Sequence, residues 1–264
     1  MSEPTRLTDR ATICAYLRRN VPLHIYQIGD LDDFFWPHTE WWSWPGEGTT
    51  EALALIYHAQ SGATLIVLDS DNHSSNLALV RALRPKLPSR FYAHLSPGME
   101  VALAEFCELD DHGLHLKMHA ALSPARSSGE SSGIEPLTIE QTRDIEEFYR
   151  AAYPGNWFDP RMLATGMYFG ARDNGRLIAA GGVHVYSPQY QVAAIGNVAT
   201  LPQYRGRGLA TAVMQAIMHA LAPTITSVGL NVKADNAAAI ACYRRLGFVE
   251  VAPYRELSAI KRDT

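Results

Sequence analysis

Hydrophobic residues recur at helical spacing in the second half of the chain. Leu209, Val213, Ile217 and Leu221 lie four residues apart, which predicts a helix with one apolar stripe facing a sheet. Runs of apolar and small residues, separated by turn signals, predict strands. Together these patterns predict helices at 138–152, 207–221 and 236–246, and strands at 167–171, 177–186, 191–200, 228–233, 248–253 and 255–260.

Turn and capping residues set several of these boundaries. Asp173-Asn174-Gly175 is typical of a hairpin turn between the first two strands. Thr138 and Gln141 have the spacing of a capping box at the start of the first helix. Gly247 suits the left-handed position that follows the last helix.

The first half of the chain is also predicted to be mixed α/β. Its patterns predict helices at 9–19, 21–35, 73–83 and 99–108, and strands at 52–58, 64–68, 90–95 and 114–122. Asp9 is a candidate N-cap of the first helix. Between the halves, residues 123–133 are rich in Ser and Gly and have no hydrophobic periodicity, as in a flexible linker. We therefore expect an N-terminal domain at 1–122, a linker at 123–134 and a C-terminal domain at 135–264.

Composition restricts the class of protein. Hydrophobic residues make up 47% of the 264 residues, which favours a globular protein over a disordered chain. A membrane span is not expected, because no stretch of about 18 apolar residues occurs. The N-terminus is polar and lacks the apolar core of a secretory signal. The 3 cysteines are far apart and form no CxxC pair, which indicates a reducing, cytoplasmic compartment and no disulfide framework.

Charge differs between the halves. Residues 136–264 contain 13 Lys and Arg against 10 Asp and Glu, and residues 1–135 contain 10 against 17. Neither half is strongly basic, so nucleic acid is not an expected partner. A small anionic ligand suits the second half better.

The segment 197–211 (NVATLPQYRGRGLAT) carries the most specific chemistry. A predicted strand runs into Pro202, then a basic turn with two glycines, then a helix. Gly206 and Gly208 allow close approach of the backbone to a ligand, and the first turn of a helix offers unpaired N–H groups to a phosphate. Arg205 and Arg207 add positive charge. From the turn alone, an exposed basic loop without a ligand stays an alternative.

These residues resemble the acyl-CoA-binding motif Q/R-x-x-G-x-G/A of the GNAT superfamily of N-acetyltransferases, in its FR47-like branch. Arg205-x-x-Gly208-x-Ala210 fits the motif, and Gln203-x-x-Gly206-x-Gly208 fits it one register earlier. A second matching block, Leu230-Asn231-Val232 followed by Asn236 to Phe248, lies downstream. The resemblance covers about half of the chain. It implies an α/β fold with a mixed, mostly antiparallel sheet flanked by helices.

The resemblance also implies a binding site for acetyl-CoA as acyl donor, with no metal. In this family one strand splays from its neighbour and pairs with the pantetheine arm, and the loop after it cradles the pyrophosphate. The residues that the resemblance assigns to acetyl-CoA are Val198, Ala199, Thr200, Gln203, Arg205, Gly206, Arg207, Gly208, Leu209, Ala210, Thr211, Asn231, Asn236 and Tyr243. Asn236 is also a good helix N-cap.

The resemblance assigns catalysis to Tyr243, as the general acid that protonates the departing thiolate. Many family members place a glutamate on the strand before the loop, but residues 192–197 here contain no carboxylate. His184 is our candidate base, because the pKa of histidine suits proton transfer near neutral pH, with Tyr190 as a further candidate. For Tyr243 and His184 alike, simple packing is the alternative.

The reaction expected of this protein is transfer of an acetyl group from acetyl-CoA to a primary amine of a small molecule or peptide. A non-catalytic acyl-CoA-binding module and a nucleotide-binding domain are the alternatives. The acceptor amine and the oligomeric state stay open. The first half has a similar order of elements without the loop motif, so it is interpreted as a degenerate GNAT-like domain.

Other features of the sequence are interpreted mainly as packing. The aromatic run at 36–44 is expected to pack a loop or a domain interface, with an acceptor-pocket wall as the alternative. Tyr153, Trp157 and Phe158 are expected to shape the acceptor site, as that region does in the family. His112, His115 and His119 lack a further ligand type nearby, so no metal site is expected. Cys242 is expected to pack rather than react.

Overall fold

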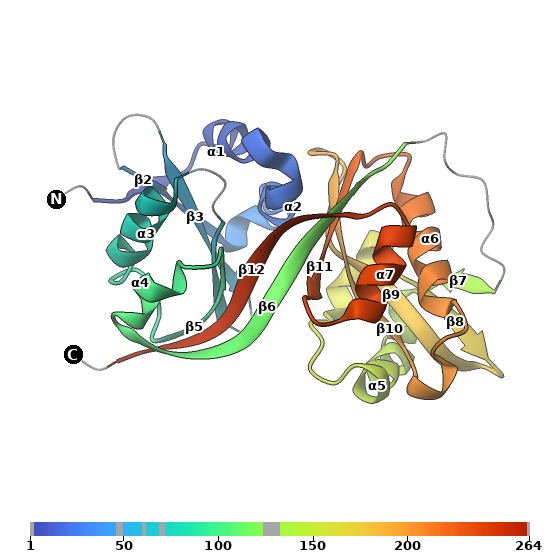
Figure 1. The fold of residues 1–264 in the computed structure, drawn as a ribbon. Helices are drawn as coiled ribbons and strands as arrows, with labels where there is room; N and C mark the ends of the chain where they lie inside the picture. The colour runs from blue at the N-terminus through green and yellow to red at the C-terminus, as the bar shows by residue number, and fades with distance from the viewer. Residues whose placement is uncertain (1–2, 46–49, 60–61, 69–71, 124–132, 263–264) are drawn as a thin grey trace. The chain divides into compact units, whose positions relative to one another are not determined.

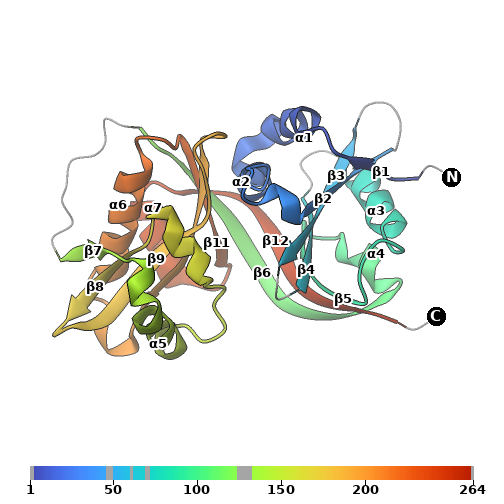
Figure 2. The same cartoon turned by 180° about the vertical axis from the view of Figure 1, so that it is seen from behind.

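The computed structural model describes residues 3–45, 50–59, 62–68, 72–123 and 133–262. The chain divides into two compact units. The first takes the chain up to Lys117, Val232–Asp235 and the stretch from Val251 onward, and the second takes Met118–Asn231 and Asn236–Glu250. Each is mixed α/β, with a mostly antiparallel sheet flanked by helices, as expected (Figures 1 and 2).

The sheet of the first unit has the strand order β1-β2-β3-β4-β5-β12-β6. Its strands are β1 (Thr5–Leu7), β2 (Thr39–Trp44), β3 (Ala52–Ala59), β4 (Gly62–Val67), β5 (Arg90–Leu95), β12 (Val249–Lys261) and the first part of β6 (Cys107–Ala121). β4 and β5 are parallel, because the helix α3 (His73–Ala82) connects them across one face of the sheet. α1 (Arg10–Leu17) and α2 (Val21–Gly29) lie over the opposite face from α3 and α4 (Glu100–Ala104) (Figures 1 and 2).

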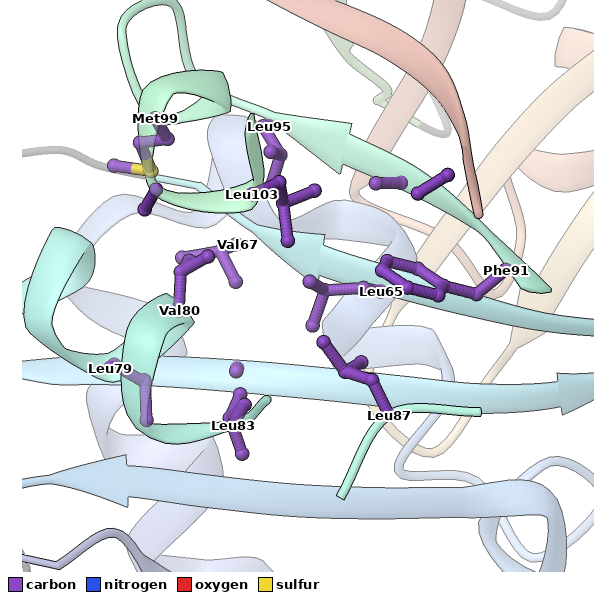
Figure 3. Packing of buried hydrophobic residues seen from close by; sticks show 14 of the residues in the cluster. Leu65, Val67, Leu79, Val80, Leu83, Leu87, Phe91, Leu95, Met99 and Leu103 are labelled. Carbon is purple, nitrogen blue, oxygen red and sulfur yellow. The ribbon is translucent and has the colours of Figure 1, made fainter. Parts of the chain in front are cut away.

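One hydrophobic cluster of the first unit lies between this sheet and the helices α3 and α4. Alternate residues of each strand point to one face of a sheet, so Leu65 and Val67 of β4 lie beside Phe91 and Leu95 of β5. Figure 3 shows these side chains against Leu79 and Val80 of α3, Leu83 at the end of that helix and Leu103 of α4, all of them buried. The side chain of Asp9 accepts hydrogen bonds from the N–H groups of Ala11 and Thr12, so the predicted N-cap of α1 is confirmed.

The sheet of the second unit has the strand order β6-β11-β10-β9-β8-β7. Its strands are β7 (Ile134–Pro136), β8 (Phe169–Asp173), β9 (Arg176–Ser187), β10 (Val192–Thr200), β11 (Ser227–Lys233) and the last part of β6. β10 and β11 are parallel and are connected by α6 (Leu209–Leu221). α6 and α7 (Ala237–Arg245) cover one face of this sheet, and α5 (Thr142–Ala152) covers the other (Figures 1 and 2).

Most predicted elements of the second half are confirmed. Val213, Ile217 and Leu221 of α6 are fully buried, as the apolar stripe requires. The capping box of Thr138 and Gln141 forms, although the first turn that it caps is a 3-10 turn and α5 itself begins at Thr142. The β8–β9 turn holds Asn174 and Gly175 at positive φ, which matches a type I′ hairpin.

Several predicted boundaries are wrong. The helix expected at 99–108 ends at Ala104, because Cys107 begins β6. The helix expected at 21–35 ends at Gly29. The two strands expected at 248–253 and 255–260 are one continuous strand, β12, which contains Pro253 and pairs with β5 from Arg255 onward. Strand β2, with Trp41, Trp42 and Trp44, was not predicted as a strand.

The pairing of β12 also affects the domain organisation. Residues Arg255–Ile260 pair with β5, so the last strand of the chain completes the sheet of the first unit. Residues 124–132 of the expected linker lie outside the described residues. The division into an N-terminal domain at 1–122 and a C-terminal domain at 135–264 stays a prediction.

In the part of the chain that the structure describes, no helix is long and apolar enough to cross a membrane.

Candidate active site

The parallel strands of the second unit separate at one point. The β10–β11 ladder runs from Val192–Ser227 to Ile195–Leu230, but β10 continues to Thr200 and β11 to Lys233. From Gly196 onward β10 still pairs with β9 but no longer pairs with β11. One backbone edge of β10 is therefore left uncovered by β11 at Val198, Ala199 and Thr200. An extended ligand could pair with this edge as an added strand.

The loop after β10 leads directly into a helix N-terminus. Gly206 and Gly208 have φ of 76° and 78°, a backbone conformation that L side chains rarely adopt. A Cβ at either position would meet no atom within 4 Å, so the space over both glycines is open. Among the described residues no side chain caps α6 at Gly208. The first N–H groups of α6, at Leu209, Ala210 and Thr211, are those that a helix leaves unpaired within itself.

Positive charge lines the same loop. Arg205 and Arg207 are exposed. The Arg205 guanidinium donates to the carbonyl of Thr200 at 3.3 Å, and that of Arg207 donates to the carbonyl of Gln203 at 3.4 Å. Neither guanidinium pairs with a carboxylate within the described part of the chain. Gln203 lies in the exposed 3-10 turn Pro202–Tyr204 that begins the loop. The loop therefore offers both amides and cations to a phosphate group.

Two buried polar atoms at the split have no hydrogen-bond partner among the described residues. They are the Oγ1 atom of Thr200, on β10, and the Nε2 atom of His184, on β9. A buried polar group without a partner costs free energy, and such groups are rare in folded proteins. Together with the free space over Gly206 and Gly208, these atoms fit a bound ligand that carries polar groups along β10.

The second motif block lies on β11 and α7. Asn231 follows Leu230, the last residue of the β10–β11 ladder, and so marks the β11 side of the split. The Oδ1 atom of Asn236 accepts a hydrogen bond from the N–H of Ala239 at 3.1 Å, so this side chain is the N-cap of α7. Tyr243 lies two turns further along α7, half-buried, with its ring centroid 6.1 Å from that of Phe248.

Burial raises the pKa of Tyr243 well above its ordinary value, and the neighbouring Cys242 and Tyr153 add to this effect. The phenol therefore keeps its proton throughout the neutral range and can donate it. Cys242 is buried, and its sulfur lies 3.2 Å from the Oγ1 of Thr211 on α6, as the packing interpretation expected.

The two candidate bases lie in very different places. His184 packs against β10, since a Cβ on Gly196 would lie 2.3 Å from its Nε2. Burial lowers the pKa of His184, against an opposing effect of the Asn197 side chain, so the ring is neutral at pH 7. Tyr190 lies in the β9–β10 turn, seven residues before Asn197, which is about 23 Å along an extended strand. The structure therefore brings His184 to the split and leaves Tyr190 at the other end of β10.

A cavity of about 320 Å³ lies beside α5, on the face opposite α6. It is lined by Glu146, Tyr149 and Arg150 of α5 and by Pro154, Gly155, Asn156 and Phe158 of the following loop. Phe158 was expected to shape an acceptor site and does line this cavity, whereas Tyr153 and Trp157 are exposed. The aromatic wall with one carboxylate and one guanidinium suits a small polar molecule.

Sequence reasoning missed a buried group beside the split. Asn197 of β10 has φ of 54° and lies at a β-bulge between Gly196 and Ala199. Its atoms bond to the hydroxyl groups of Tyr149 and Tyr168. The glycines inside two predicted strands, at 181–182 and at 196, are the available signal, because glycine within a strand often marks a bulge or a close approach.

The tryptophans of the aromatic run and the three histidines at 112, 115 and 119 have packing or hydrogen-bond partners. Trp41 and Trp42 are buried in the first unit, as the packing interpretation expected, and Trp42 belongs to its core. His112, His115 and His119 bond to three different partners, the Oγ of Ser258, the carbonyl of Gly113 and the Oγ of Ser227. Within the described residues no group of three His, Cys, Asp or Glu side chains is arranged to hold a metal ion.

Sequence comparison identifies the family of this region. Residues 134–248 match the model of the acetyltransferase (GNAT) family, and they form a GNAT family domain. Mycothiol acetyltransferase of Tsukamurella paurometabola is 36% identical over 99 residues, which are 36% of this chain and 34% of that protein. Mycothiol acetyltransferase of Clavibacter michiganensis subsp. michiganensis is 38% identical over 105 residues, 39% of this chain and 31% of that protein. The matched segment thus spans about a third of these curated relatives.

Solved structures share the fold over nearly the whole chain. A Drosophila protein has a TM-score of 0.69 at 13% identity, covering 98% of this chain and 99% of that one. A GCN5-related N-acetyltransferase from Sphaerobacter thermophilus has a TM-score of 0.62 at 14% identity, covering 99% and 96%. A tandem GNAT protein from the clavulanic acid biosynthesis pathway has a TM-score of 0.58 at 15% identity and is covered completely, as is this chain. The chain therefore has the GNAT fold, and the solved structures match it over both units.

Proposed function

We propose that the second unit transfers an acetyl group from acetyl-CoA to a primary amine of a small molecule or peptide. The observation that carries this proposal is the split between β10 and β11, which leads into the glycine-rich, basic start of α6. The family match at 134–248 covers both features. The amides of Leu209 to Thr211, with Arg205 and Arg207, would hold the pyrophosphate, and the edge of Val198 to Thr200 would pair with the pantetheine arm.

The transfer needs one bond to form and one to break. The amine nitrogen attacks the thioester carbon, so a C–N bond forms and the C–S bond breaks. The amine loses a proton to a base, and the departing thiolate takes a proton from Tyr243. No covalent bond to the enzyme is required, and no metal enters the reaction as proposed.

His184 is the proposed base, acting directly or through a water molecule. Its neutral, unpartnered Nε2 is the form that accepts a proton. Because its pKa is lowered from 6.5, kcat/KM for the amine keeps the His184-dependent contribution down to pH 6.5 and loses it below the lowered pKa. His184→Gln is expected to lower kcat by about 10- to 100-fold and to remove this acid limb.

The measurement is the pH–rate profile of wild type and variant with one amine. Tyr190→Phe is the matched control and keeps the wild-type profile, because Tyr190 lies at the far end of β10. An acid limb that is unchanged in His184→Gln excludes His184 as the base.

The cavity beside α5 is the proposed place for the acceptor. Glu146 can face an ammonium group, and Arg150 can face an anionic group on the same molecule. A panel of acceptors should therefore contain simple amines, amino acids and peptides. It should also contain amines related to mycothiol, since two curated relatives carry that name.

The alternative from another class is a non-catalytic module that binds acyl-CoA. The absence of a carboxylate on β10 favours it, whereas the protonated phenol of Tyr243 favours the enzyme. Thiol release from acetyl-CoA, measured with and without each amine, distinguishes the two. We expect release that depends on the amine; tight binding of acetyl-CoA without such release across the panel would support the binding module.

The first unit is proposed to be a degenerate GNAT-like domain. Its parallel pair β4–β5, joined by α3, repeats the arrangement of β10, α6 and β11. The sequence after β4 is Leu68-Asp69-Ser70-Asp71-Asn72, which lacks the glycines and arginines of the other loop. Two acidic residues at this place do not suit a phosphate, so acetyl-CoA is expected in the second unit alone.

A further inference from the structure

Two buried tyrosines hydrogen-bond to Asn197 of β10, one to its backbone and one to its side chain. The hydroxyl of Tyr149, on α5, donates to the carbonyl oxygen of Asn197 at 2.8 Å. The Nδ2 atom of Asn197 donates to the hydroxyl oxygen of Tyr168 at 3.0 Å, and that hydroxyl donates in turn to the sulfur of Met162 at 3.4 Å. Tyr149, Tyr168 and Asn197 are all buried. We call these three residues the Asn197 brace.

The backbone around the brace is shaped to receive it. Asn197 has φ of 54°, a left-handed conformation that asparagine tolerates better than most residues. Gly196 and Gly182 are paired across β10 and β9. A Cβ on Gly182 would lie 2.1 Å from the ring of Tyr168, so glycine there lets the ring lie flat against the strand. The strands therefore accommodate the brace at the cost of one side chain, at Gly182, and one unfavourable φ, at Asn197.

The brace sets the direction of the next amide. The peptide group between Asn197 and Val198 is planar and trans, so its carbonyl and its N–H point in opposite directions. Because the carbonyl points to Tyr149, the N–H of Val198 points away from α5. The β10–β11 ladder ends two residues earlier, at Ile195. An extended ligand with its phosphates at the start of α6 would bring its far, acyl end to this peptide.

We propose that Tyr149 and Tyr168 are positioning residues for acyl transfer, which fix the orientation of the Asn197–Val198 peptide at the acyl end of the site. This inference rests on the proposed function. Neither phenol needs to touch the acyl group or the amine. Tyr149 also lines the cavity beside α5, so one residue joins the wall of the proposed acceptor site to the backbone that meets the acyl group.

The test compares three removals of a tyrosine hydroxyl group. Tyr149→Phe and Tyr168→Phe remove the two hydroxyls of the brace. Tyr186→Phe is the matched control, because its hydroxyl bonds to the Oγ1 of Thr224, 3.1 Å away, near the other end of β9. Each protein is measured for its melting temperature, its Kd for CoA, and kcat and KM with an amine that supports thiol release.

We expect Tyr149→Phe and Tyr168→Phe to lower kcat by about tenfold or more, with the Kd for CoA within about threefold of wild type. Tyr186→Phe keeps the wild-type kcat. A purely structural role would lower the melting temperature and weaken CoA binding without a selective loss of kcat. Brace variants with the kcat of the control overturn the proposal.

A second readout needs no turnover. The amide signal of Val198 in a ¹H–¹⁵N spectrum is compared between the CoA-bound and the acetyl-CoA-bound protein. We expect a difference in wild type and in Tyr186→Phe that is lost in Tyr149→Phe, whereas an equal difference in all three contradicts the brace. Absence of binding or of amine-dependent turnover in wild type would contradict the proposed function instead.

Discussion

Gly208→Val is expected to weaken acetyl-CoA binding by about 100-fold, which corresponds to about 2.7 kcal/mol of binding free energy. Gly208 is the N-cap of α6 with φ of 78°, and the space over its Cα is free of protein atoms within 4 Å. A side chain there would occupy the space through which a pyrophosphate approaches the first N–H groups of α6. It would also strain the left-handed backbone. Isothermal titration with acetyl-CoA measures the change.

The control separates loss of binding from backbone strain. Gly166→Val places the same side chain at φ of 68°, again with no atom within 4 Å, in a turn before β8. Both variants are expected to lose stability, which thermal unfolding measures, but Gly166→Val keeps the wild-type Kd. If Gly208→Val bound acetyl-CoA as tightly as Gly166→Val, the start of α6 would not be the phosphate site.

Tyr243→Phe is expected to lower kcat by about 100-fold while the Kd for acetyl-CoA changes less than about threefold. The phenylalanine ring keeps the contact with Phe248, so α7 keeps its packing. What is lost is the one proton that the phenol donates to the departing thiolate. Because burial raises the pKa of Tyr243, deprotonation of this residue does not limit the rate at neutral or mildly alkaline pH.

Steady-state kinetics with a good and a poor leaving thiol sharpen this test. A general acid matters more for the poorer leaving group, so the loss in Tyr243→Phe should grow as the pKa of the thiol rises. Tyr186→Phe serves again as the control for removal of a hydroxyl. Turnover of Tyr243→Phe at the wild-type rate would remove this residue from the mechanism.

Local sequence was sufficient to predict a feature where all the residues of that feature lie in one short segment. The loop at 203–211 combines its glycines, its arginines and the start of its helix within nine residues, so their proximity follows from the chain itself. The cap of α7 by Asn236 and the turn at Asn174-Gly175 are local in the same sense, and the structure confirms both. The same reasoning failed at 99–108 and at 248–260, where pairing with a distant strand decides which residues are extended.

The sequence by itself therefore determined the family of the second half and the position of its proposed phosphate-binding loop, since the residues involved are neighbours in the chain. Only the tertiary structure decided the end of the β10–β11 ladder, the partner of β12 and the surroundings of Asn197. Tyr149 lies 48 residues from Asn197 and Tyr168 lies 29 residues from it, and neither separation has a periodicity that predicts contact. These features depend on strand register and on which face of the sheet α5 covers, which are properties of packing and not of any local pattern.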